Sequence, residues 1–159
     1  MNSLKILSAQ VENKPGTLFK MTNLARLLHF NIEGVAIGTT SRQDISRVIF
    51  TLNATDRANM ELLVKQTSKL IDVLDVSVYS PSDVIARELA LIEVKASDAI
   101  LDRLRGIPEC RVVGSAGKTV ILEAACDFGK VDEVLEKIGR SEVLSLARTG
   151  VIALPKRSS

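Results

Sequence analysis

Histidine, cysteine and aromatic side chains are scarce in this sequence. It contains a single histidine, His29, two cysteines and no tryptophan, and aromatic residues make up 3% of its 159 positions. Nucleophilic combinations such as Ser–His–Asp or Cys–His find no match, and neither does a glycine-rich phosphate-binding loop. Cys110 and Cys126 have no His or Cys neighbour at metal-ligand spacing. We therefore predict two buried thiols, no metal site and no catalytic residue.

An excess of one charge and a long apolar run are also missing. Twenty-one basic and 19 acidic residues give a net charge of +2. Without a basic surface or stacking aromatics, nucleic-acid binding is not indicated. No run approaches the ~18 apolar residues of a membrane span, and no charged segment followed by an apolar run opens the chain. We expect a cytoplasmic protein that binds neither nucleic acid nor membrane.

Apolar periodicity in the first half indicates a βαββαβ order. Strands are predicted over residues 4–11, 31–37, 45–53 and 73–79. Two helices lie between them, the second capped by Asp56. The helix stripes that face the sheet are predicted to be Leu18, Met21, Ala25 and Leu28 in the first helix and Met60, Leu63, Thr67 and Leu70 in the second.

The second half repeats this plan without strong identity to the first. A strand over residues 88–96 is followed by a short helix capped by Ser97 or Asp98. A hairpin turns around residues 115–117, Asp127 is predicted to cap the next helix, and residues 143–147 form a last strand.

These patterns predict an α+β fold of two tandem ferredoxin-like βαββαβ domains. Turn residues place a linker at 80–86 between a first domain at 1–79 and a C-terminal ferredoxin-like domain at 87–159. The sheet face opposite the helices of the first domain includes Ile49 and Thr51, which are only partly polar. We expect that face to need cover, and hence a homodimer.

A tight turn between the first strand and the first helix is the most informative motif. The sequence Asn13-Lys14-Pro15-Gly16 ends the strand, and a helix starts at once with Thr17-Leu18. The first backbone N–H groups of such a helix are unpaired, and the positive end of the helix dipole favours a carboxylate. Asn31, which precedes Ile32 in the next strand, has an amide oxygen for an ammonium group and an amide nitrogen for a carboxylate. Together these groups suit a free amino acid, while a plain strand-to-helix connection also uses Pro-Gly.

Two further positions bear on function. His29 ends the first helix, where a residue that tolerates a left-handed backbone or a positive charge is useful, so we interpret it as structural. An acylphosphatase would be the enzymatic option for this fold, but its phosphate-binding loop needs an arginine where this chain has Asn13-Lys14-Pro15. We predict that the chain is not an enzyme.

Six stretches then occur in the order typical of one known family. They are residues 12–18, 31–33, 46–47, 69–73, 87–94 and, as the most specific, Ala147-Arg148-Thr149-Gly150-Val151-Ile152-Ala153-Leu154. With these stretches nearly the whole chain resembles the small regulatory subunits of acetolactate synthase (acetohydroxyacid synthase), whose first half is an ACT domain.

The resemblance implies a noncatalytic subunit that activates the catalytic large subunit and confers feedback inhibition by valine, or a related branched-chain amino acid, in branched-chain amino-acid biosynthesis. It implies a homodimer with the ligand between two ACT domains. No cofactor is implied in this chain, whereas thiamine diphosphate, magnesium and FAD are expected in the catalytic partner. The valine-binding positions carried over from the family are Asn13, Lys14, Pro15, Gly16, Thr17, Leu18, Asn31 and Ile32.

An alternative function is a stand-alone ACT-type amino-acid-binding or assembly module that acts on another enzyme or regulator. The stretch Arg148-Thr149-Gly150 favours the first interpretation, because a generic ACT module has no reason to carry it. The residues themselves suggest no physical role for this stretch beyond a final strand and turn.

Overall fold

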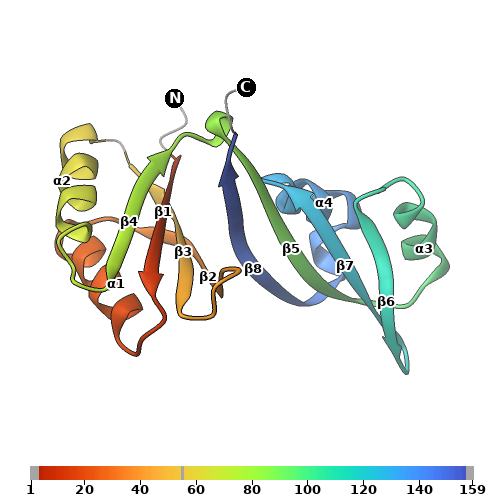
Figure 1. The fold of residues 1–159 in the computed structure, drawn as a ribbon. Coiled ribbons are helices and arrows are strands. Elements are labelled where there is room, and N and C mark those ends of the chain that lie inside the picture. The colour runs from red at the N-terminus through yellow and green to blue at the C-terminus, as the bar shows by residue number, and fades with distance from the viewer. Residues whose placement is uncertain (1–3, 55, 157–159) are drawn as a thin grey trace. The chain divides into compact units, whose positions relative to one another are not determined.

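Two compact units make up the structure, a computed structural model that describes residues 4–54 and 56–156 (Figure 1). One unit contains the chain up to Ile85 together with the segment from Val151 onward, and the other runs from Ala86 to Gly150. The chain thus passes between units inside two strands, β5 and β8. The elements in order are β1 (Leu4–Glu12), α1 (Thr17–Leu27), β2 (Ile32–Thr39), β3 (Ile45–Asn53), α2 (Arg57–Thr67), β4 (Val73–Tyr79), η1 (Pro81–Asp83), β5 (Val84–Lys95), α3 (Asp98–Leu104), β6 (Cys110–Ala116), β7 (Thr119–Asp127), α4 (Lys130–Ile138), η2 (Arg140–Glu142) and β8 (Val143–Pro155).

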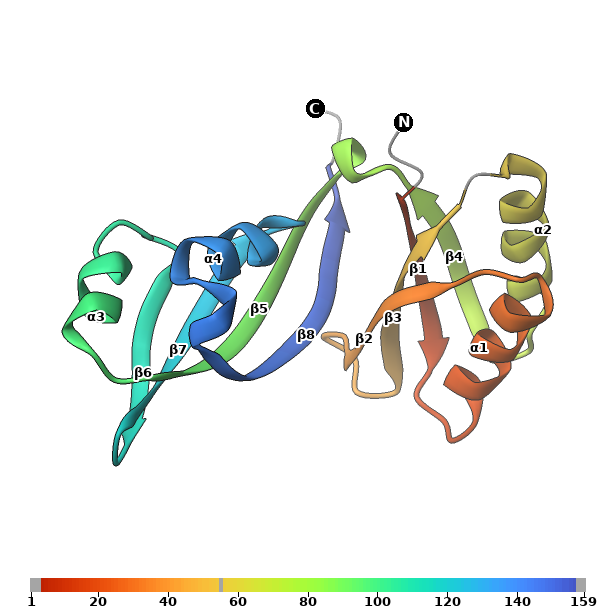
Figure 2. The same cartoon turned by 180° about the vertical axis from the view of Figure 1, so that it is seen from behind.

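Both sheets have four strands and the same topology. Their strand orders are β2-β3-β1-β4 and β6-β7-β5-β8, so the first and third strands of each repeat lie in the centre. Two helices cover one face of each sheet, and Figure 2 shows α3 and α4 in front of the second sheet. This arrangement confirms the predicted α+β fold of two tandem ferredoxin-like domains.

The core of the first unit follows the predicted helix stripes. Alternate residues of the central strands face the helices, and Phe50 and Leu52 are at most 1% exposed. Met21, Ala25 and Leu63 contact them from α1 and α2. Asp56 caps α2 as predicted, because its carboxylate accepts the backbone N–H groups of the second and third helical residues.

The opposite face of the first sheet differs from our expectation. Ile49 and Thr51 are only 3% and 5% exposed in a single chain, and Ile6 and Ser8 of the neighbouring strand are buried as well. The prediction that this face needs a second copy for cover is therefore wrong.

Two boundaries in the second unit also differ from the prediction. Asp127 does not cap α4, because β7 continues through Asp127 and the helix begins one residue after Gly129, which has φ 81° and no side-chain cap. The last strand continues beyond residue 147 to Pro155. Ser97, one of the two predicted caps of α3, does accept the N–H of Ile100 at 3.3 Å.

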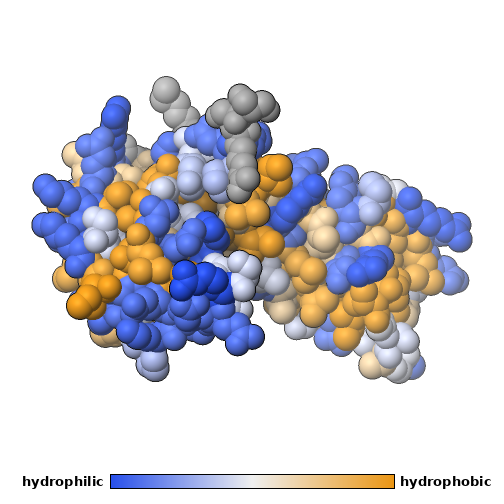
Figure 3. Space-filling model, viewed as in Figure 1, coloured by the Kyte–Doolittle hydropathy of each residue, from blue (hydrophilic) through white to orange (hydrophobic). Residues whose placement is uncertain are grey.

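The second sheet keeps one open apolar face. Side chains on alternate positions of β5 and β7 pack against α3 and α4, and Ile92 and Leu122 are fully buried. On the other positions Leu91 is 42% exposed. Figure 3 shows a broad hydrophobic area over β5, β6 and β7 of this unit.

The end of α1 explains the single histidine. His29 has φ 59°, the left-handed conformation that usually requires glycine. The N–H of Phe30 donates to the carbonyl of Ala25 at 2.9 Å, and the N–H of His29 donates to that of Arg26 at 3.0 Å. These two bonds form a Schellman motif with His29 at its left-handed position. The structural interpretation of His29 is therefore the one that the backbone supports.

His29→Gly should raise the free energy of unfolding by up to about 1.5 kcal/mol. Left-handed backbone costs a non-glycine residue about 1–2 kcal/mol, while glycine adds about 0.5–1 kcal/mol of unfolded-state entropy. Urea unfolding measures the difference, with His29→Ala as the control that keeps the backbone strain. A glycine variant that is no more stable than the alanine variant would contradict this account.

The two cysteines belong to the second core. Cys126 is fully buried and Cys110 is half-buried at its margin. Burial raises the pKa of the Cys110 thiol to about 11. Among the described residues no group of three or more His, Cys, Asp or Glu side chains could hold a metal ion, and no helix is long and apolar enough to cross a membrane.

The Cys110 thiol should react slowly with disulfide reagents such as DTNB. At pH 8 a thiol with a pKa of about 11 has about one hundredth of the thiolate of a thiol with the ordinary cysteine pKa of 9.0. We expect a rate about a hundredfold below that of the urea-unfolded chain, measured on a Cys126→Ala background. Equal rates in the folded and unfolded chains would refute the raised pKa.

Candidate functional site

The turn after β1 leaves the start of α1 open. Gly16 precedes the helix with φ 89°, and no side chain caps the helix there. The first intrahelical bond runs from Lys20 N to Gly16 O at 3.1 Å, so the N–H groups of residues 17–19 have no partner within the helix. A Cβ at Gly16 would meet nothing within 4 Å. Glycine is therefore favoured here by the left-handed backbone and not by lack of space.

Asn13 and Thr17 shape this turn. The Asn13 side chain donates through Nδ2 to the carbonyl of Gln43 at 3.1 Å, and its backbone N–H donates to the carbonyl of Asp44 at 2.8 Å. Thr17 is buried, and its hydroxyl donates to the carbonyl of Lys14 at 3.3 Å. The amide nitrogen of Asn13 is thus already engaged with the β2–β3 connection, although the residue as a whole is exposed.

Charged side chains around the turn neutralise one another. Three basic residues each contact an acidic one, and the Glu12 carboxylate raises the pKa of Lys14 while Arg42 lowers the pKa of Asp44. No net charge is left on these side chains, so the unpaired N–H groups of α1 are the main positive feature. The pairs are Lys14–Glu12, Lys20–Asp72 at 2.6 Å and Arg42–Asp44 at 2.6 Å.

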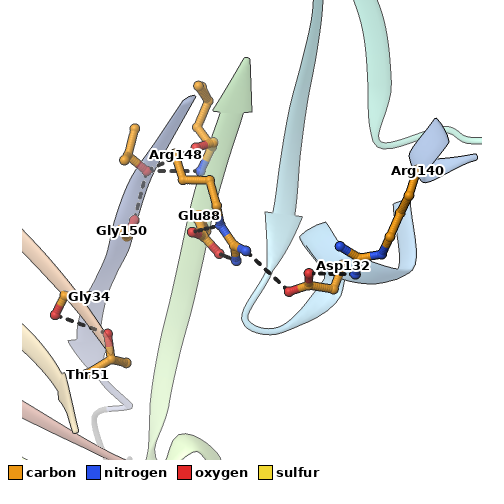
Figure 4. Close-up of polar contacts among 9 residues, drawn as sticks. Gly34, Thr51, Glu88, Asp132, Arg140, Arg148 and Gly150 are labelled. Carbon is orange, nitrogen blue, oxygen red and sulfur yellow. Dashed lines mark hydrogen bonds and ion pairs between the residues drawn. The ribbon is translucent and has the colours of Figure 1, made fainter. Parts of the chain in front are cut away.

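The remaining predicted residues divide between core and surface. Leu18 and Ile32 are half-buried against the core of the first unit and serve packing as well as any site wall. Pro15 and Asn31 are exposed. After Asn31 the ladder between β2 and β3 shifts register between Ile32 and Gly34, and the Thr51 hydroxyl donates to the Gly34 carbonyl at 3.3 Å across that bulge (Figure 4).

One chain does not bring the two halves of the predicted site together. Helix α1 has 11 residues, so Gly16 and Asn31 lie at opposite ends of a rod about 16 Å long. The strand register also places them far apart. Ile32 pairs with Leu52, which in turn pairs with Lys5 near the start of β1, whereas the Gly16 turn follows Glu12 at the other end of β1. A molecule the size of an amino acid cannot contact both halves within one chain.

Residues far apart in sequence support the turn and were missed by the sequence reasoning. Gln43 and Asp44 accept the Asn13 bonds, and the buried Asp72 accepts the Glu12 N–H through its carbonyl at 2.8 Å. No local pattern could have found them, since their separations from the turn are 30 residues or more and their bonds form through backbone carbonyls.

Comparison with known proteins decides the family. A family model described as AHAS small subunit-like ACT domain matches residues 7–75, and one described as small subunit of acetolactate synthase matches residues 87–157. The chain is 35% identical to the probable acetolactate synthase small subunit of Archaeoglobus fulgidus, over 93% of this chain and 94% of that protein. The chain belongs to the acetolactate synthase small-subunit family.

Other relatives agree over the full length. The acetolactate synthase small subunit of Bacillus subtilis is 29% identical over 96% of this chain and 90% of that protein. The crystal structure of the small subunit from Thermotoga maritima superposes with a TM-score of 0.87 at 26% identity, covering 98% of this chain and 99% of that one. Both domains are therefore typical of the family.

The most specific motif of this small-subunit chain now has a structural role. Arg148 of β8 forms a two-pronged contact with Glu88 of β5, from Nε and Nη2 to the two carboxylate oxygens at 2.7 Å each. The hydroxyl of Thr149 accepts the N–H of Leu89 at 3.1 Å, and Gly150 has φ 74°. The motif thus holds β8 against β5 by an ion pair and a hydrogen bond, and the next residue has a backbone conformation that favours glycine.

The Arg148 contact continues into helix α4, as Figure 4 shows. Arg148 Nη1 contacts Asp132 at 3.2 Å, and Asp132 also accepts Arg140 at 3.0 Å. The Arg140 and Arg148 contacts lower the pKa of Asp132, and Glu88 raises the pKa of Arg148. Glu88 is 5% exposed, so its carboxylate depends on Arg148 for its charge partner.

Arg148→Met should lower the free energy of unfolding by about 2–3 kcal/mol, because it leaves a buried carboxylate without a partner. The matched control is Arg87→Met, on the same strand as Glu88. Arg87 pairs with Asp127, and both side chains are more than half exposed, so the loss of this pair should cost less than about 1 kcal/mol. Urea unfolding of both variants measures the contrast. Equal losses would show that the Arg148 pair is no more than a surface contact.

Proposed function

We propose that this chain is the regulatory subunit that activates the catalytic subunit of acetolactate synthase and makes it sensitive to valine or a related branched-chain amino acid. The observation that carries the proposal is the open start of α1 beside side chains whose charges are fully paired. A zwitterion has no net charge, so it gains from the helix N–H groups without opposing an uncompensated side chain.

A homodimer would complete the site. Strand β2 is an edge of the first sheet, and Ile37 on it is 53% exposed. If two copies pair their β2 strands antiparallel around a two-fold axis, the start of β2 in one copy lies beside the end of β2 in the other. Since β2 ends near the Gly16 turn, Asn31 of one copy then approaches Gly16 of the other. This arrangement supplies both halves to one ligand.

The regulatory effect then requires a difference between two states. A ligand bound between two copies favours the dimer arrangement in which Gly16 of one copy and Asn31 of the other meet. It can change the activity of the catalytic partner only by as much as its affinities for this arrangement and for the alternative one differ. A typical coupling of about 1–3 kcal/mol corresponds to a change of roughly fivefold to 150-fold. The catalytic partner would hold the thiamine diphosphate, magnesium and FAD expected for the reaction, and this chain would hold none, in a cytoplasmic complex.

The direct test is acetolactate formation by the catalytic subunit from the same organism, with and without the purified chain and then with valine. We expect stimulation by the chain and its reversal by valine. Stimulation without reversal would keep the subunit role and refute the valine site. No stimulation, together with retained amino-acid binding, would establish the stand-alone module instead.

Gly16→Asp should abolish inhibition, because it places a carboxylate where the ligand carboxylate is expected. Gly16→Asn is a matched control, since both side chains tolerate left-handed backbone, have the same shape and meet open space. The half-inhibitory valine concentration should be at least about tenfold higher for the aspartate variant than for the asparagine variant, the ratio that about 1.4 kcal/mol of repulsion gives. Equal sensitivity of the two variants would refute the proposed site.

A further inference from the structure

The first unit has a concave surface between α2 and the edge strand β4. It is a cleft of about 610 Å³, a size typical of small-molecule sites. It is separate from the Gly16 turn, because Lys5 in its wall is seven residues from Glu12 along β1, or about 24 Å. The lining residues are Lys5, Ala54, Asp56, Arg57, Met60, Glu61, Val64, Lys65 and Val78.

The walls of the cleft are apolar. Val78 of β4 is paired with Leu7 of β1, whose side chain is in the helix-packed core, so Val78 faces the helices. Met60 and Val64 approach from α2, and Met60 is 7% exposed. The short side chains of Ala54, Val64 and Val78 leave the space unfilled. Such a lining suits an aliphatic chain and offers nothing for an aromatic ring system to stack on.

The two carboxylates at the rim are already engaged. Asp56 accepts the N–H groups of Ala58 and Asn59 as the cap of α2. Glu61 accepts Arg57 Nε at 2.9 Å, one turn apart on the helix. Glu61 therefore matches the charge of Arg57, while Asp56 keeps one negative charge against the two lysines, so the three basic and two acidic lining residues give a net charge of +1.

The two lysines at the rim have no acidic partner among the described residues. Lys5 is half-buried, and its Nζ donates to the Ser80 hydroxyl at 2.9 Å. Ser80 is itself fixed by the capping box that it forms with Asp83. Lys65 is exposed on α2 and makes no ion pair with a described residue. An apolar cleft with uncompensated positive charge at its edge suits a molecule with an aliphatic body and an anionic head.

We infer that this cleft is a second ligand site, which takes an aliphatic monocarboxylate of medium chain length. The aliphatic chain lies between Met60, Val64 and Val78, and the carboxylate accepts Lys5 Nζ. The inference does not depend on the amino-acid site, since it uses different residues at a different place in the unit.

Octanoate is the probe, titrated into the full chain by calorimetry and followed by amide chemical shifts. We expect saturable binding of one octanoate per chain, with shifts gathered on α2 and the adjoining end of β4. Octanol and octylammonium, which have the same chain with no charge or the opposite charge, should bind at least about tenfold more weakly, because they lack the charge-assisted bond to lysine.

Three variants locate the site. Lys5→Met keeps the aliphatic stem and removes the charge, so octanoate affinity should fall about tenfold or more while octanol affinity stays unchanged. Val64→Phe should abolish binding by filling the cleft, with thermal unfolding as the check that the chain still folds. Lys137→Met, on the exposed side of α4 in the other unit, is the matched control and should bind octanoate as the wild type does.

Several outcomes would overturn the inference. Equal affinity for the three probes would indicate plain adsorption to apolar surface, and unaltered binding in both Lys5→Met and Val64→Phe would place octanoate elsewhere. Affinity that falls as the protein concentration rises would show that a second copy of the chain occupies the cleft. Gly16→Asp should leave octanoate binding intact, so failure of the amino-acid site and failure of this site are distinguishable.

Discussion

The length and direction of α1 constrain how the first unit can bind an amino acid. The helix runs from the Gly16 turn to the His29 cap along the sheet, and it holds the unpaired N–H groups at one end and Asn31 at the other. A helix of 11 residues cannot be shortened without moving both strands that it connects. The two halves of the proposed amino-acid site therefore meet only if a second chain supplies one of them. The free edge of β2 is the surface from which such a pairing can start.

Charge balance distinguishes the two concave or open regions of this unit. Around the Gly16 turn each cationic side chain has an acidic neighbour, which leaves the backbone of α1 as the source of positive potential. At the cleft beside α2 Glu61 pairs with Arg57, and Lys5 and Lys65 outnumber the remaining carboxylate of Asp56, which leaves a net charge of +1. A neutral zwitterion suits the first environment and an anion with an apolar body suits the second.

The second unit depends on a different interaction. Glu88 is charged and almost fully buried on a central strand, so the fold needs Arg148 to reach it from β8. Thr149 and Gly150 follow directly and let the strand continue past this contact with a changed direction. The Arg148-Thr149-Gly150 stretch thus holds β8 against β5, just before the chain leaves one unit for the other.

Much of the fold was determined by the sequence alone. Strand and helix periodicity, the Asp56 cap and the left-handed tolerance of His29 are local properties, because each depends on residues within a few positions of one another. The residues of the Gly16 turn were predictable for the same reason. Asp127 was misread as a cap because a carboxylate near a helix start is common, and only the extent of β7 showed that Gly129 takes that place. The tertiary structure alone decided the burial of Ile49 and Thr51, the anchoring of Asn13 to Gln43 and the pairing of Arg148 with Glu88. The contacts among these features join residues that are 30 to 60 positions apart, and no local pattern records which distant strand will lie beside which.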